Sequence, residues 1–118
     1  GKPSGAGRAG VRAARLRAIK QHIGENLHNP RLSAETAGRR LDISPRYVRR
    51  LFAAEGRSFS DYVTERRLAA VRQRLSDPRF ADRPIAEIAF EAGLVEPSTF
   101  YRQFKARYGA KPSEIRLG

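Results

Sequence analysis

The sequence predicts an all-α protein in which one pair of short helices occurs twice, on either side of a long helix. Three observations lead to this prediction. Apolar residues recur at steps of three and four over most of the chain, which is the spacing of one helix face. Pro and Gly fall between these periodic segments, where they begin and end helices. The pattern of the first half also returns at an offset of 52 positions, which brings Phe52 onto Phe104.

The composition points to a polyanionic partner. The 118 residues suit one compact domain or two small ones. A formal net charge of +12 favours nucleic acid or an anionic membrane surface, and charge alone does not choose between them. No apolar run is long enough to span a membrane and no leader is present, so we expect a cytoplasmic protein with no membrane partner. There is no cysteine, and His22 and His28 would face different sides of a helix, so we expect no metal and no cofactor.

The first ten residues differ from the rest of the chain. Residues 1–10 are rich in Gly and show no apolar period, so we expect a flexible linker or a remnant of the expressed fragment. From Val11 onward, apolar residues at steps of three and four predict a first helix that ends before Pro30. The apolar residues of this stripe are Leu16, Ile19, Ile23 and Leu27.

Two short helices are predicted next. Ser33 can cap a helix that runs to about Arg40, and Ser44 with Pro45 starts a second helix before Gly56. About three residues remain for the turn, and this layout is a helix-turn-helix. Residues 11–57 therefore form a first helix-turn-helix subdomain, in which a small residue at position 37 would let the two helices approach closely. The predicted inward positions are Ala37, Leu41, Val48, Leu51 and Phe52.

A long linker helix and a second subdomain complete the chain. Residues 58–76 contain neither Gly nor Pro, and a helix of about 17 residues would be roughly 26 Å long. Its apolar residues at steps of three and four are Leu68, Val71 and Leu75. In residues 77–118, Pro84 suits the first turn of a helix and Gly93 suits a helix end. The predicted fold is thus two helix-turn-helix subdomains joined by a long linker helix, with about seven helices.

The internal repeat supports this organisation. At the offset of 52, Ala34, Glu35, Ala37, Pro45, Arg50, Phe52 and Ala54 coincide with Ala86, Glu87, Ala89, Pro97, Arg102, Phe104 and Ala106. One inserted residue then brings Gly56 onto Gly109. Solenoids need three or more stacked repeats, so two copies favour a protein with a pair of recognition units. The alternative for the last long helix is an amphipathic surface helix with solvated charges, and the repetition of the whole unit argues against it.

The second copy resembles a known family. The segment "IAEIAFEAGLVEPSTFYRQFKARYGAKPSEIR" (85–116) is similar to the signature pattern of the AraC/XylS family of bacterial transcription regulators, and the resemblance extends from about Val11. Leu94 departs from the pattern, because family members usually have Phe there, and its apolar character is kept. The resemblance implies the C-terminal DNA-binding domain of such regulators, with seven helices and the second helix of each unit entering a DNA major groove.

The resemblance also implies which residues face DNA bases. They are Arg46, Tyr47, Arg49 and Arg50 in the first unit and Pro97, Ser98, Tyr101 and Arg102 in the second. A guanidinium can donate two hydrogen bonds to the O6 and N7 of guanine, so an exposed Arg is a plausible reader. The alternative is that Arg46, Arg49 and Arg50 of the first unit only neutralise phosphates. The excess of Arg over Lys in the whole chain leaves that alternative open.

Phosphate contacts are expected at a second set of residues: Ser33, Arg40, Ser44, Arg57, Pro84 and Lys105. The helix starts near Ser33 and Pro84 offer free backbone amides. Residues 31–57 carry seven basic and three acidic residues (+4), whereas residues 84–118 carry five and four (+1). We therefore expect the first unit to supply more of the affinity. Two helices in successive major grooves must lie about 34 Å apart, so one chain could occupy an asymmetric site, with some DNA bending.

The expected partner is double-stranded promoter DNA, and RNA polymerase is a candidate protein partner. We expect a monomeric fragment, and a full-length protein that dimerises through an N-terminal domain of the kind common in this family. A sequence-tolerant architectural or RNA-binding protein would share the charge but read shape. We do not expect an enzyme, because no nucleophile with a base, phosphate-binding Gly-rich loop or carboxylate pair is recognisable.

Overall fold

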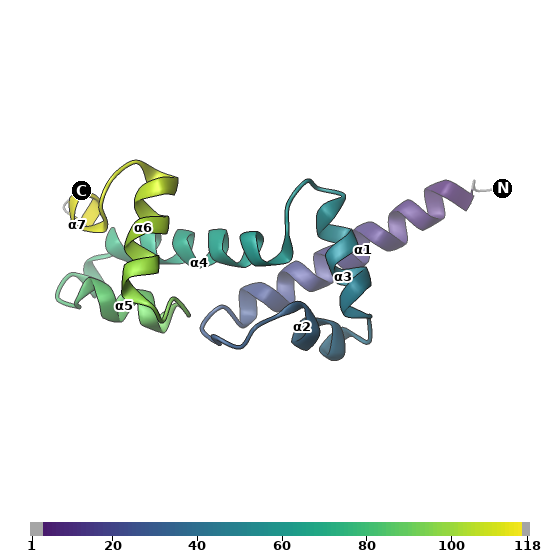
Figure 1. The fold of residues 1–118 in the computed structure, drawn as a ribbon, viewed down its shortest axis with the longest axis horizontal. Coiled ribbons are helices and arrows are strands. Elements are labelled where there is room, and N and C mark those ends of the chain that lie inside the picture. The colour runs from purple at the N-terminus through teal and green to yellow at the C-terminus, as the bar shows by residue number, and fades with distance from the viewer. Residues whose placement is uncertain (1–3, 117–118) are drawn as a thin grey trace. The chain divides into compact units, whose positions relative to one another are not determined.

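The computed structural model describes residues 4–116, and within this range the chain is helical without any strand (Figure 1). The elements are α1 (Ser4–Glu25), α2 (Ala34–Leu41), α3 (Pro45–Ala53), α4 (Phe59–Leu75), the short 3-10 helix η1 (Pro78–Phe80), α5 (Ile85–Glu91), α6 (Pro97–Tyr108) and α7 (Pro112–Arg116). The predicted all-α fold with about seven helices is confirmed.

The chain divides into two compact units. The first contains α1, residues 31–58 and the start of α4 up to residue 63; the second contains residues 27–30 and everything described from residue 64 onward. The boundary falls inside α4. The helix that the sequence analysis set apart as a linker therefore contributes buried side chains to both units, Val63 to the first and Val71 to the second.

Helix α1 is longer than the sequence predicted. A linker was expected over residues 1–10, but residues 4–10 are helical, and residues 1–3 lie outside the described part. The buried anchors of α1 are Ile19 and Ile23, while Val11 is 50% exposed. Extending an existing helix by one residue adds one backbone hydrogen bond at little further cost. A helix held by its C-terminal half can therefore run into Gly-rich sequence that would not start a helix by itself.

The two helices of the first helix-turn-helix begin where the sequence predicted. The Ser33 side chain accepts a hydrogen bond from the Thr36 amide (3.1 Å), and Thr36 Oγ1 accepts one from the Ser33 amide (2.9 Å), so a reciprocal cap starts α2. The Ser44 side chain accepts from the Tyr47 amide (3.1 Å), with Pro45 in the first turn of α3. Both helix starts are thus local consequences of short polar side chains.

Removing the α2 cap provides a stability test. We expect Ser33→Ala to lower the free energy of unfolding by about 1 kcal/mol, because the first-turn amide of Thr36 loses its acceptor. Ser60→Ala, at an exposed position of α4, should change it by less than about 0.5 kcal/mol. Urea denaturation of both variants measures the difference. Equal stability of the two variants would show that the cap is energetically silent.

The turn of the first unit depends on a glycine that the sequence analysis did not single out. The small residue expected to allow the close approach of the two helices, Ala37, is fully buried. The tightest contact is at Gly38, where a Cβ would overlap the carbonyl oxygen of Ile43. The Ile43 amide donates to the Gly38 carbonyl (2.8 Å), and Asp42 takes a left-handed conformation (φ 58°) to close the helix end. Any side chain at position 38 would push the turn away from α2.

The second unit has its own core. Its members come from α4, α5 and α6: Leu68, Val71, Leu75, Ile88, Ala89, Ala92, Phe100 and Phe104. Phe104 is fully buried, with its ring centroid 5.8 Å from that of Phe100 and 4.7 Å from that of Tyr108. Leu94, the position where the family pattern has Phe, is partly buried and packs against this core. An apolar side chain at this position is therefore part of the packing, as expected from the sequence.

The structure corrects the register of the repeat. The offset of 52 holds for the second helices, whose N-cap residues are Ser44 and Glu96. The first helices correspond at an offset of 51 instead, because their N-caps are Ser33 and Pro84. The helix ends confirm this offset, because the left-handed residues after them, Asp42 and Gly93, are also 51 positions apart. The same holds for the hydrogen bonds that close the two ends, from Ile43 N to Gly38 O (2.8 Å) and from Leu94 N to Ala89 O (2.9 Å).

The changed register has a physical cause. One residue, Ile43, separates the left-handed Asp42 from the next N-cap, whereas Leu94 and Val95 both follow the left-handed Gly93. The turn of the second unit is therefore one residue longer. The identities that paired the start of α2 with the start of α5 at an offset of 52 were coincidental. The N-cap positions, rather than residue identities in the sequence, define which residues of the two units correspond.

Candidate nucleic-acid interface

Helices α3 and α6 each bury one face and expose the other. On α3, Val48, Leu51 and Phe52 are buried; on α6, Phe100 and Phe104 are buried. The residues predicted to face DNA lie on the opposite faces: Arg46, Arg49, Arg50, Pro97, Ser98, Tyr101 and Arg102 are exposed, and Tyr47 is half-buried. Each second helix is thus held by apolar side chains and presents its polar ones.

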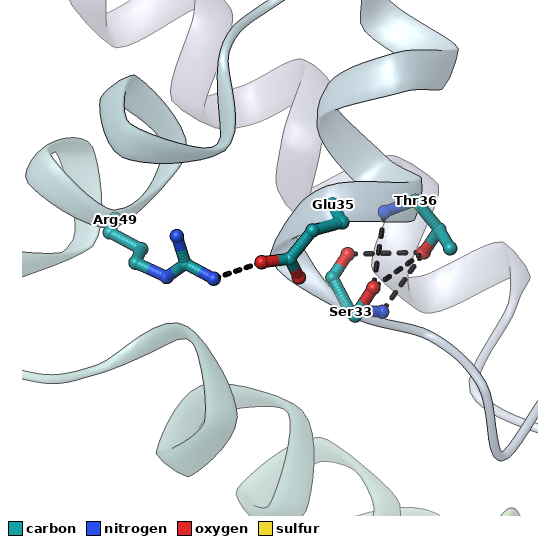
Figure 2. Close-up of polar contacts among 4 residues, drawn as sticks. All are labelled: Ser33, Glu35, Thr36 and Arg49. Atoms are coloured by element: carbon teal, nitrogen blue, oxygen red, sulfur yellow. Dashed lines mark hydrogen bonds and ion pairs between the residues drawn. The ribbon is translucent and has the colours of Figure 1, made fainter.

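Arg49 is not an isolated cation. Its guanidinium donates a hydrogen bond to Oε1 of Glu35, a residue in the first turn of α2 (Figure 2). This bond holds the pKa of Glu35 below its usual range, so the side chain is a carboxylate at neutral pH. The pair joins the two helices of the first helix-turn-helix on their exposed side. The sequence identified Arg49 as a DNA-facing residue, whereas Glu35 was noted only as a member of the repeat.

Tyr47 and Arg57 each take part in a contact between a guanidinium group and an aromatic ring. The guanidinium of Arg15 lies 5.5 Å from the centroid of the Tyr47 ring, so α1 covers this aromatic side chain. The guanidinium of Arg57 lies 4.7 Å from the centroid of the Tyr62 ring. Both predicted DNA-facing residues therefore already hold partners within the first unit.

Helix α6 begins with an acidic cap. The Glu96 carboxylate accepts hydrogen bonds from the amide and the hydroxyl of Ser98 (3.2 and 2.6 Å). The Ser98 bond is the main reason that the pKa of Glu96 lies below its usual range. The hydroxyl that sequence analysis offered to DNA is thus bonded to a neighbouring carboxylate, and Glu96 is a polar group of this surface that the analysis missed.

A hollow of about 490 Å³ lies beside α6 in the second unit. Its lining combines apolar and cationic side chains: Ile85, Tyr101, Arg102, Lys105, Lys111, Pro112 and Ser113. Tyr101 is 42% exposed and packs against Phe100, with ring centroids 4.9 Å apart. Sequence analysis named Lys105 as a phosphate contact, and the structure adds Lys111 to the same basic rim.

The predicted phosphate contacts differ in their surroundings. The hydroxyls of Ser33 and Ser44 both cap helices, and Ser33 stands beside the carboxylate of Glu35. Pro84 is the N-cap of α5, where it has no amide hydrogen and makes no side-chain cap. Arg40 and Lys105 remain as exposed cations from that set. Contact of these two side chains with phosphate stays a prediction.

One arginine that sequence analysis counted only as charge has a structural part. Arg67 of α4 donates hydrogen bonds to the carbonyls of Leu27 (2.9 Å) and Asn29 (2.6 Å), which tie the loop after α1 to the second unit. Partial burial lowers the pKa of its guanidinium. No short-range pattern could mark this residue, because its partners lie about 40 positions earlier in the chain.

Within residues 4–116, the structure brings no three His, Asp or Glu side chains together in a way that could hold a metal ion. In the same range, no helix combines the length and the apolar content needed to cross a membrane.

Known proteins share this architecture. Residues 37–118 match a family described as a helix-turn-helix domain. The chain is 34% identical over 102 residues to the transcriptional activator RhrA of Rhizobium meliloti (strain 1021), covering 86% of this chain and 32% of that protein. It is 30% identical over 95 residues to the regulatory protein SoxS of Escherichia coli (strain K12), covering 80% of this chain and 85% of SoxS. The chain thus spans about a third of the length of RhrA.

A solved structure agrees with these relatives. The fold is similar to that of the C-terminal domain of AraT, a response regulator from Geobacillus stearothermophilus, with a TM-score of 0.77 and 28% identity. The match covers 87% of this chain and 84% of that one.

Proposed function

This chain belongs to the AraC/XylS family of transcription regulators, and on that premise we propose that it binds double-stranded promoter DNA sequence-specifically and so regulates transcription. We further propose that α3 and α6 are its two recognition helices, each entering a major groove. One observation supports this most. Each is the second helix of a helix-turn-helix, anchored by buried apolar residues and presenting basic and polar side chains outward.

The exposed residues of the two helices suggest unequal contributions. Arg50 and Arg102 correspond at the offset of 52 and are both exposed. The first unit carries the larger excess of positive charge, as counted above, and presents three exposed arginines on α3. We therefore expect it to supply most of the affinity, while α6, with Glu96 at its start, contributes less.

A matched pair of substitutions tests this ordering. Arg50→Ala is expected to weaken binding to the selected site by about 1–3 kcal/mol, and Arg102→Ala by less, because phosphate attraction is weaker around α6. Fluorescence anisotropy with a labelled duplex at fixed salt measures both. A larger loss from Arg102→Ala would contradict the proposed dominance of the first unit.

A sequence-tolerant architectural or RNA-binding role is the competing proposal. Selection of bound duplexes from a random pool, followed by salt titration with the selected and a scrambled duplex, separates the two. We expect a recurrent motif and a clear preference for it at physiological salt. Equal affinities for both duplexes over the whole titration would favour the competing role. Dimerisation through another domain and contact with RNA polymerase are further proposals that rest on family membership alone.

A further inference from the structure

We propose that Glu35 is a positioning residue that holds Arg49 for reading one guanine of the DNA site and keeps this arginine from serving as a general phosphate contact. The inference rests on the proposed function and deepens it, because it assigns a base to one side chain. The main support is the side-chain hydrogen bond from Arg49 on α3 to Glu35 on α2 (Figure 2).

Fold stability does not account for this pair. The side chains of Arg49 and Glu35 are 56% and 52% exposed, and ion pairs at such exposure contribute little to stability. The two residues nevertheless have well-defined backbones. Glu35 stands in the first turn of α2, which the Ser33–Thr36 reciprocal cap holds, and Arg49 lies on a helix anchored by its buried neighbour Val48. The pair therefore places a guanidinium at a defined position on the exposed side of α3.

The chemistry of the pair favours a neutral acceptor over an anionic one. The bond to Glu35 uses one N–H of a guanidinium that has five, so enough donors remain for a bidentate contact. A phosphate approaching Arg49 would meet the negative charge of Glu35, which opposes it. Guanine offers two neutral acceptors, O6 and N7, on its major-groove edge, and no other base offers such a pair there. Arg49 beside Glu35 is thus biased from phosphate toward guanine.

The second unit lacks this device at the corresponding positions. Glu35 is the second residue after the N-cap Ser33, and the second residue after the N-cap Pro84 is Ala86. Arg49 is the fifth residue after the N-cap Ser44, and the fifth after Glu96 is Tyr101. A helix-turn-helix therefore occurs once with the pair and once, with a turn one residue longer, without it. The guanine preference assigned to the pair should be confined to the half-site of the first unit.

Selection of duplexes from a random pool by four forms of the chain tests the proposal. The wild type is expected to select a guanine at one position that Arg49→Ala no longer selects. Glu35→Gln should weaken the preference at that position only, while binding a scrambled duplex several-fold more tightly. Its plot of log affinity against log salt should be steeper by roughly 0.9, the equivalent of one added phosphate contact. Glu35→Asp, which keeps the charge, should retain part of the preference.

Glu87→Gln is the matched control, because it removes one exposed carboxylate from α5 and leaves Arg49 and its partner in place. It should leave the selected motif unchanged. Thermal unfolding of every variant shows that it is folded. An unchanged guanine preference in Glu35→Gln would overturn the proposal, and so would an Arg49→Ala variant that loses affinity equally for all duplexes. If the wild type selected no motif at all, the proposed function itself would fail, which is a separate outcome.

Transplantation gives an independent arm. The double variant Ala86→Glu with Tyr101→Arg builds the pair into the second unit at the corresponding positions. A folded double variant is expected to select an additional guanine in the second half-site. A folded double variant that selects the wild-type motif would contradict the proposal that the pair reads guanine.

Discussion

Replacing Phe52 with alanine is expected to lower the free energy of unfolding by about 3–5 kcal/mol. The Phe52 side chain is fully buried in the first unit. Its ring centroid lies 5.6 Å from that of Phe59 in an edge-to-face arrangement and 5.2 Å from that of Tyr62. The alanine variant loses this apolar burial and leaves a cavity that the rigid helices around it cannot close. Against a typical total stability of about 5–15 kcal/mol, the loss is large.

Urea denaturation followed by circular dichroism measures this effect, with Phe90→Ala as the control. Phe90 is 61% exposed, so its truncation should change the unfolding free energy by less than about 0.5 kcal/mol. A drop in the denaturation midpoint without a change of slope would show a loss of stability within a two-state transition. A loss below about 1 kcal/mol for Phe52→Ala would mean that the α3 aromatic does not anchor its helix.

The second large effect is expected for Gly93→Ala in the turn of the second unit. Gly93 has φ 96°, a conformation that costs a residue with a Cβ roughly 1–2 kcal/mol. A Cβ there would also overlap the Leu27 carbonyl oxygen and lie 2.6 Å from Nε of Arg67. Because Arg67 itself donates to that carbonyl, the neighbours cannot all move aside. The overlap adds about 1–3 kcal/mol, so the total loss should be about 2–5 kcal/mol.

Gly109→Ala separates the two causes. Gly109 also has a positive φ (72°), but no atom lies within 4 Å of the Cβ position. Its substitution should therefore cost only the backbone part, about 1–2 kcal/mol. Thermal and urea denaturation of both variants give the difference. Equal losses at the two glycines would show that the close approach of Leu27 and Arg67 carries no energetic weight.

Local signals in the sequence predicted most helix boundaries correctly. Ser33 and Ser44 stand directly before helices, Pro45 is the first residue of α3, and Pro84, expected in the first turn of a helix, lies one residue earlier as the N-cap of α5. Such predictions succeed because a cap involves atoms only two or three residues apart. The buried and exposed faces of α3 and α6 also followed from the spacing of their apolar residues, since one face of a helix repeats every three or four positions.

The errors arose where a wider context decides. Residues 4–10 join a helix that is anchored further along the chain, which their own composition cannot reveal. The predicted offset of 52 was wrong for the first helix of each unit because the turn after Gly93 is one residue longer. Coincidental residue identities at that offset hid the difference. In the candidate interface, the sequence could not show that the Ser33 hydroxyl caps α2 and that the Ser98 hydroxyl donates to the Glu96 carboxylate.

The sequence by itself determined the helical class, the duplicated unit, the positive charge and the exposed residues of both candidate recognition helices. These properties depend on composition and on short-range spacing. Only the tertiary structure decided that Arg49 is held by Glu35 and that Arg67 supports a distant loop. It also showed that Gly38 and Gly93 have no room for a Cβ. Contacts between separate segments depend on how the helices pack, and no local pattern encodes which arginine meets which oxygen.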